Sequence, residues 1–179
     1  MRGAAGNRCP YRDRRVVALA HPQGVTVEGE LGVIGQVDQV TAEGGGQSTL
    51  TDPHMAAAFV EKTGIDALAV SIGNAHGFYT KLPHLDFERL AKLKAATRIP
   101  LVLHGGSGTP EADLRRAISL GIAKVNVATE VIAAVRQSLL EQWSTGKNLW
   151  TPIAQAVAMQ AMAKVVEKWF HLTKAAGRA

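Results

Sequence analysis

Residues 100–127 read PLVLHGGSGTPEADLRRAISLGIAKVNV, and their pattern indicates the class of fold. A short apolar run is followed by a Gly-rich turn, an amphipathic segment and a second apolar run. A strand, a helix and a strand in this order form a β–α–β unit with parallel strands. We therefore expect strands over 100–103 and 124–127, with a helix that starts after Thr109–Pro110 between them.

The same alternation continues on both sides of this stretch. Apolar or alternating runs predict strands over 25–31 (VTVEGEL) and 67–72 (ALAVSI). Helix-start residues predict helices after Asp52–Pro53, after Asp86 and from Thr129 to about 143, and a last helix from Thr151–Pro152 to about 170. Four successive β–α units with apolar strands predict an α/β fold with a parallel sheet, and four units are half of a (β/α)8 barrel.

Length and composition exclude several classes of protein. The chain has 179 residues, about one domain, with 46% hydrophobic residues and one cysteine, so neither a disordered chain nor a disulfide scaffold is expected. No apolar run approaches the ~20 residues of a membrane helix, and no signal-peptide core is visible. We expect a soluble, cytoplasmic protein that does not bind membranes.

The net charge of +5 is concentrated at the N-terminus. Residues 1–15 contain five arginines and one aspartate, so the other 164 residues carry 15 basic and 14 acidic side chains, a net charge of +1. The high isoelectric point therefore reflects a short Arg-rich leader, and no nucleic-acid partner is expected.

Two histidines follow successive predicted strands, His76 in IGNAHG and His104 in VLHGGSG. Either one alone is more often a core or loop histidine than a ligand. Two at equivalent strand ends favour a metal site, because imidazole is a common zinc ligand. Glu28 and Glu30 share one face of their strand, where a cation or a barrel-interior network would stabilise them; an edge strand with one solvated face explains them equally well.

The turn HGGSG precedes a predicted helix and offers backbone N–H groups to an anion. The segment 126–129 (NVAT) repeats this arrangement at the next strand. In barrels, phosphate sites favour the loops after the last two strands, which these would be. The pair of turns therefore indicates a phosphate site.

Together these residues resemble the class II, metal-dependent fructose-bisphosphate aldolases, nearest to the tagatose-bisphosphate aldolase branch. The matching stretches are VEGELG, LTDPHMAAAFVEKTGIDALAVSIGNAHGFY, LDFERL, IPLVLHGGSG and GIAKVNVATE. The resemblance implies a homo-oligomeric (β/α)8 barrel. It also implies reversible, zinc-dependent cleavage of fructose or tagatose 1,6-bisphosphate to dihydroxyacetone phosphate and glyceraldehyde 3-phosphate.

The resemblance also assigns roles to single residues. His76 and His104 are implied as zinc ligands, although cobalt or iron would also suit this donor set, and Glu30 as the ligand of an alternative or second metal position. Asp38 lies where the family has an acidic residue, more often glutamate, that moves the substrate proton. The residues implied in substrate binding are Gly77, Gly105, Gly106, Ser107, Asn126, Val127, Ala128 and Thr129.

The resemblance covers residues 15–179, the C-terminal half of the barrel: four β–α units and a C-terminal helix. The family's other half carries an Asp–His pair that supplies a catalytic aspartate and the third zinc histidine. Residues 1–14 match neither half, and we expect no function for them. A truncated chain with weak or no activity of its own is therefore expected. A non-catalytic phosphosugar-binding half-barrel and a gene remnant are the alternatives.

Overall fold

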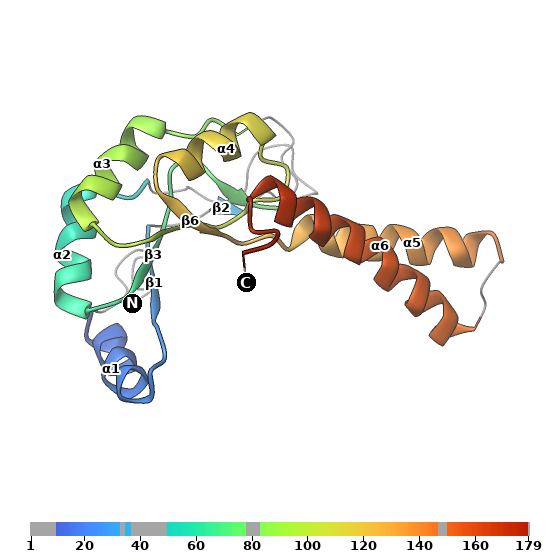
Figure 1. The fold of residues 1–179 in the computed structure, drawn as a ribbon, viewed down its shortest axis with the longest axis horizontal. Helices are drawn as coiled ribbons and strands as arrows, with labels where there is room; N and C mark the ends of the chain where they lie inside the picture. Colours follow the sequence, from blue (N-terminus) through green and yellow to red (C-terminus); the bar gives the residue numbers. More distant parts are fainter. Residues whose placement is uncertain (1–9, 33–34, 37–49, 78–82, 147–149, 179) are drawn as a thin grey trace, which may run out of the picture. The chain divides into compact units, whose positions relative to one another are not determined.

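The computed structural model describes residues 10–32, 35–36, 50–77, 83–146 and 150–178 (Figure 1). The chain divides into two compact units, Met1–Asn126 and Val127–Ala179. The first unit contains the sheet, and the second consists of two helices.

The main sheet of the first unit has four parallel strands in the order β1-β3-β5-β6. These strands are β1 (Glu28–Leu31), β3 (Ala67–Val70), β5 (Leu101–Leu103) and β6 (Ile122–Val125). They neighbour one another in chain order, and a helix follows each of them, as the predicted series of β–α units requires. The described strands β1 and β6 form the two outer positions of this sheet.

Four helices of the first unit lie in a row outside the sheet (Figure 1). They are α1 (Pro10–Ala20), α2 (Pro53–Thr63), α3 (Phe87–Thr97) and α4 (Glu111–Ser119), with a 3-10 turn, η1 (His21–Gln23), after α1. Asp52 and Asp86 accept hydrogen bonds from the first turns of α2 and α3, at 2.9 Å in both cases. The predicted N-caps of both helices are therefore confirmed.

The register of the sheet separates an apolar face from a polar one. A Cβ on Gly29 would lie 2.7 Å from Ile65 Cδ1 and 3.0 Å from Phe59, so the backbone of β1 packs closely against the helix layer here. Leu68 pairs with Gly29, and Leu101 pairs with Leu68, so all three face the helices. The neighbouring residues in each strand face the other way.

Two strands differ from their predicted bounds. β1 begins at Glu28 rather than at Val25, because the N–H of Val27 donates to the Asp66 carboxylate at 2.7 Å instead of joining a ladder. β6 begins at Ile122, two residues before the predicted start, and ends at Val125. A second, two-stranded parallel sheet that the sequence analysis did not predict pairs β2 (Gly35–Gln36) with β4 (Ala75–His76).

The second unit is a hairpin of α5 (Thr129–Ser144) and α6 (Thr151–Leu172), both close to their predicted bounds. Glu130 near the start of α5 accepts hydrogen bonds from Lys168 and Trp169 near the end of α6, at 2.8 and 2.7 Å. At the opposite end, Gln142 donates to the carbonyl of Ala154 at 3.0 Å. The two helices are therefore antiparallel and tied at both ends.

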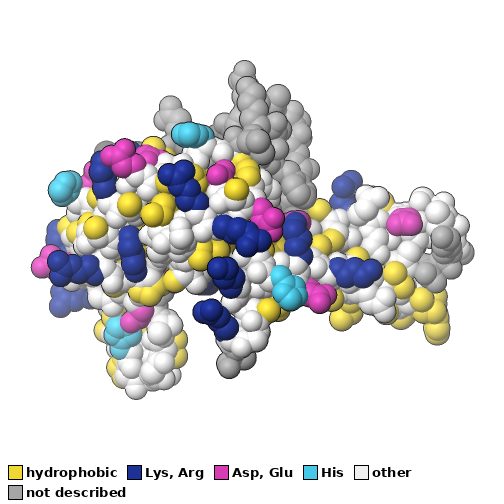
Figure 2. Space-filling model, turned by 45° about the horizontal axis from the view of Figure 1, so that its top comes forward, with side chains coloured by type: hydrophobic (Ala, Val, Ile, Leu, Met, Phe, Trp, Pro, Cys, Tyr) yellow, Lys and Arg dark blue, Asp and Glu magenta, His cyan; other side chains and the backbone are white. Residues whose placement is uncertain are grey.

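Many large apolar side chains of the hairpin are exposed, and Figure 2 shows hydrophobic side chains gathered at its turn end. The exposed large apolar side chains along the two helices and beside their turn are Ile132, Leu140, Trp143, Trp150, Ile153, Val157, Met159 and Phe170. Across the described residues, no helix combines the length and the apolar character that crossing a membrane requires.

Candidate functional site

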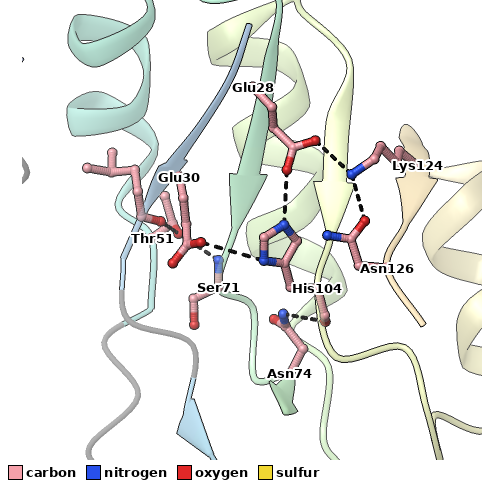
Figure 3. Close-up of polar contacts among 9 residues, drawn as sticks. Glu28, Glu30, Thr51, Ser71, Asn74, His104, Lys124 and Asn126 are labelled. Atoms are coloured by element: carbon pink, nitrogen blue, oxygen red, sulfur yellow. Dashed lines mark hydrogen bonds and ion pairs between the residues drawn. The ribbon is translucent and has the colours of Figure 1, made fainter. Parts of the chain in front are cut away.

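The polar face of the sheet carries the candidate site (Figure 3). Along this face the register pairs Glu30 with Ala69, Ala69 with Val102, and Val102 with Lys124. His104 directly follows β5, at the carboxyl edge where parallel α/β sheets hold their active sites. Glu28 and Glu30 lie on the same face, as the alternation predicted.

His104 lies between the two glutamates of β1. Its Nε2 is 3.0 Å from Glu28 Oε1, and its Nδ1 is 3.5 Å from Glu30 Oε2. The His104 side chain is 14% exposed and the carboxylates are 29% and 24% exposed, so water reaches this group only in part. The two carboxylates that the sequence placed on one face therefore share one imidazole.

Lys124 completes the charge balance around Glu28. Its Nζ lies 2.8 Å from Glu28 Oε2 and 2.6 Å from Asn126 Oδ1. Burial raises the pKa of the Glu28 carboxyl, but the hydrogen bonds and positive charges of Lys124 and His104 outweigh this effect, so the pKa lies below its usual range. Glu28 is thus held as a carboxylate that bridges the Lys124 ammonium group and the His104 imidazole.

His76 lies beside His104, at the end of β4. The ring centroids of the two histidines are 5.8 Å apart, with a tilt of 54° between the rings. The two backbone segments approach closely at this point. Gly105 has a φ of +66°, and a Cβ on it would lie 2.0 Å from the carbonyl oxygen of Ala75. The glycine after His104 therefore permits the approach that brings the two imidazoles together.

Buried polar side chains fix the backbone around these histidines. Asn74 is fully buried; its Oδ1 accepts from Ile72 N–H at 2.8 Å, and its Nδ2 donates to the carbonyl of His104 at 2.9 Å. Thr51, also buried, donates to Leu31 O and accepts from Ser71 N–H, which ties β1 to the end of β3. These bonds hold the strand ends of the site in one arrangement.

The loop after β5 pairs with the end of β6. Gly106 N–H donates to Asn126 O at 3.0 Å, and Asn126 N–H donates to Leu103 O at 2.9 Å. Ser107 is buried in the same turn. Because the Gly106 N–H is engaged within the chain, an anion bound here would use the other groups of the turn.

The remaining predicted site residues are placed as follows. Gly77 directly follows His76 and has a φ of +108°. Val127, Ala128 and Thr129 belong to the second unit, where α5 begins at Thr129 without a side-chain cap. Asp38 lies outside the described residues.

The donor set suits zinc in kind but not in number. Imidazole and carboxylate are zinc ligands, and a catalytic site takes three of them from the protein. Within the part of the chain that the structure describes, no three His, Cys, Asp or Glu side chains are grouped to hold a metal ion. Glu28 and Glu30 approach different nitrogens of His104, so they lie on different edges of one ring.

A groove of about 740 Å³ is lined by the start of α2 and by α3, and neither His76 nor His104 lines it. Its cationic side chains are paired, Arg89 with Asp86 at 3.0 Å and Lys92 with Glu88 at 2.6 Å. The groove therefore offers no unpaired lysine or arginine among its lining residues.

Solved structures with the same fold are aldolases by name. The YdjI aldolase from Escherichia coli K12 is 36% identical, with a TM-score of 0.79; the match covers 95% of this chain and 57% of that one. A protein from Coccidioides immitis, provisionally described as a fructose-1,6-bisphosphate aldolase, is 27% identical, with a TM-score of 0.82. This match covers 98% of the present chain and 61% of that protein. The chain thus spans about three fifths of the length of these proteins, and its fold is a partial (β/α)8 barrel.

A family comparison agrees with the structural one. The family model for class-II fructose-bisphosphate aldolase matches residues 12–178. The chain belongs to the class II fructose-bisphosphate aldolase family, whose members are generally metal-dependent. The matched region begins inside α1, whereas the predicted Arg-rich leader ends at residue 14; that boundary remains a prediction.

Two residues of the site, Lys124 and Asn74, were not predicted. Lys124 lies two positions before the predicted site residue Asn126, and a period of two places both on one face, so the alternation could have indicated Lys124. Asn74 stands in the quoted IGNAHG motif, but nothing in its local sequence indicates that it would bind the His104 backbone.

Proposed function

We propose that this chain carries part of the active site of a zinc-dependent ketose-bisphosphate aldolase, acting as a homo-oligomer in the cytoplasm. The supporting observation is the contact of the His76 and His104 rings at the carboxyl edge of a partial barrel, in a chain of this family. The substrates proposed are fructose or tagatose 1,6-bisphosphate. Further ligands and groups would come from outside the described residues.

The proposed reaction breaks the bond between carbons 3 and 4 of the sugar. The proton of the carbon-4 hydroxyl is removed as that carbon becomes an aldehyde. The bonding electrons stay on the dihydroxyacetone phosphate fragment, which then takes up a proton at carbon 3. A bound divalent cation would supply Lewis-acid stabilisation of the charge that develops.

The chain's own residues would divide this work. His76 and His104 would bind the metal, with Glu30 as the ligand of an alternative or second position, and Asp38 would exchange the proton. The groups proposed to bind dihydroxyacetone phosphate are Gly77, Gly105, Gly106, Ser107, Asn126, Val127, Ala128 and Thr129.

The first test is the zinc content and zinc affinity of the purified chain. We expect one zinc per chain in the wild type and loss of it in His76→Ala and His104→Ala. His54→Ala is the control, because His54 is exposed on α2 and lines the separate groove. Equal zinc binding by all three variants and the wild type would contradict the assignment.

The second test is aldol cleavage of both bisphosphates, with and without a chelator. Cleavage that the chelator abolishes would support a catalytic chain. A specific observation favours a non-catalytic alternative, namely that the described residues group no three metal ligands. A phosphosugar-binding half-barrel would be stabilised by dihydroxyacetone phosphate in thermal unfolding without cleaving either sugar.

A further inference from the structure

Glu28 and Lys124 form a bridge across the polar face of the sheet. They lie on β1 and β6, the outermost strands, which three strand spacings of about 4.8 Å each separate. Even so, Lys124 Nζ is 2.8 Å from Glu28 Oε2. Both oxygens of Glu28 are engaged, one by Lys124 and the other by His104.

The two carboxylates around His104 restrict where its proton lies. A neutral imidazole has one N–H and one acceptor nitrogen, yet each ring nitrogen here faces a carboxylate oxygen. The 3.0 Å contact of Nε2 with Glu28 has hydrogen-bond length, whereas the 3.5 Å contact of Nδ1 with Glu30 is longer than an N–H···O bond. The geometry therefore places the N–H on Nε2 and the lone pair on Nδ1.

We propose that Glu28 and Lys124 are positioning residues of the site: Glu28 fixes His104 in the tautomer that presents Nδ1 toward Glu30, and Lys124 anchors Glu28. A histidine that binds a metal commonly donates its other N–H to a carboxylate, which orients the ring and raises the basicity of the ligating nitrogen. The metal part of this inference rests on the proposed function. The tautomer part does not.

Lys124 has a second consequence, because it also donates to Asn126 Oδ1 at 2.6 Å. One ammonium group thus joins the carboxylate behind His104 to an asparagine proposed to bind the sugar. Loss of this group leaves two carboxylates beside His104 with no lysine to balance them. Lys124 therefore couples the metal-binding side of the site to its substrate side.

The tautomer is measured by nitrogen–proton multiple-bond NMR of the full, metal-free chain labelled at histidine, at about pH 8, where an ordinary imidazole is neutral. His104→Ala identifies the signal. We expect the Nε2–H form in the wild type and in Glu28→Gln, whose carbonyl still accepts the bond. Glu28→Met removes the acceptor and should give a mixture of both forms. A wild-type His104 protonated at Nδ1 overturns the proposal without any variant.

Zinc affinity supplies the second readout. We expect Glu28→Met to weaken zinc binding about 10- to 100-fold, the usual effect of removing a carboxylate that bonds a ligating histidine. Lys124→Met, which acts only through Glu28, should weaken it less. Lys92→Met is the matched control, since Lys92 forms a surface ion pair with Glu88 at 2.6 Å and should leave the affinity unchanged. Circular dichroism establishes that each variant is folded.

The two readouts separate this inference from the proposed function. Unchanged zinc affinity in both variants, together with an unchanged tautomer in Glu28→Met, refutes the positioning role while the metal assignment stands. A wild-type chain that binds no zinc but shows the Glu28-dependent tautomer refutes the metal assignment and keeps the positioning of His104.

Discussion

Gly105 determines how closely the two histidines of the site can approach. With a φ of +66° it has the left-handed conformation that side chains disfavour, and its Cα faces the Ala75 carbonyl. Gly24 has nearly the same conformation, a φ of +68°, but no atom lies within 4 Å of the position of its missing Cβ. Comparing substitutions at Gly105 and Gly24 therefore separates the energetic cost of the left-handed conformation from the cost of the close contact with Ala75.

Gly105→Ala should lower the free energy of unfolding by about 2–5 kcal/mol, the sum of left-handed strain and overpacking. Gly24→Ala should cost only the strain, about 1–2 kcal/mol. Urea unfolding of both variants measures the difference. Equal losses in the two variants would show that the contact with Ala75 relaxes freely.

The sequence predicts which residues of a single strand share a face, but it does not predict which side chains of different strands contact each other across the sheet. The shared face of Glu28 and Glu30 follows from a period of two, and the structure confirms it. The contact of Lys124 with Glu28 joins residues 96 positions apart. It depends on the strand order, which no local pattern encodes.

Among the elements, the helices that start with aspartate show how local signals determine a boundary. Asp52 caps α2, Pro53 occupies its first position, and Gly64 ends it with a φ of +73°. Each of these preferences acts within one turn, so the sequence alone predicts this helix correctly. The β2–β4 pair is short and joins distant segments, and for that reason it was not predicted.

Asp86 should make the stability of the first unit depend on pH. The Arg89 backbone N–H, together with the Arg89 side chain, holds the pKa of Asp86 below its ordinary value of 3.8. A carboxyl with a lowered folded-state pKa stabilises the fold fully above the unfolded-state value, and this contribution disappears as the pH falls through the folded-state value. Urea unfolding should show that the free energy of unfolding falls between about pH 6 and pH 2, and that it falls less in Asp86→Asn.

Asp86→Asn and Asp86→Ala separate charge from capping. Asparagine is as good an N-cap as aspartate, whereas alanine typically costs about 1 kcal/mol at neutral pH. The free energy of unfolding of Asp86→Asn should therefore be close to that of the wild type at pH 7. At acid pH it should fall less steeply with decreasing pH than in the wild type. An unchanged slope would show that other carboxyls dominate the acid transition.

On the scale of the whole chain, the molecule divides into two compact units. In the second unit, Glu130 accepts from both Lys168 and Trp169, and Trp169 is buried. Glu130→Leu removes both acceptors and should destabilise the hairpin by about 1–3 kcal/mol, because the buried indole N–H loses its partner.

Hydrogen exchange resolved by peptide tests this effect. Amides of α6 should exchange faster in Glu130→Leu, while those of β5 and β6 keep the wild-type rate. Glu167→Leu is the control, because Glu167 is exposed on the same helix. Faster exchange throughout the sheet would show that the two units unfold together.

The series of four β–α units was predicted from periodicity alone, and the structure has it. The division into two units was not predicted. Strand and helix signals look alike on both sides of residue 126, and only the packing reveals that α5 and α6 form a compact unit of their own. Periodicity reports which face of an element is apolar, but not which neighbour covers that face.

All three tryptophans of the chain, Trp143, Trp150 and Trp169, belong to the hairpin. Indole emission therefore comes from the second unit alone. Trp169 is buried while Trp143 and Trp150 are 47% and 72% exposed, so iodide should quench two fluorophores and spare one. The chain thus contains an optical probe that distinguishes its two parts without any label.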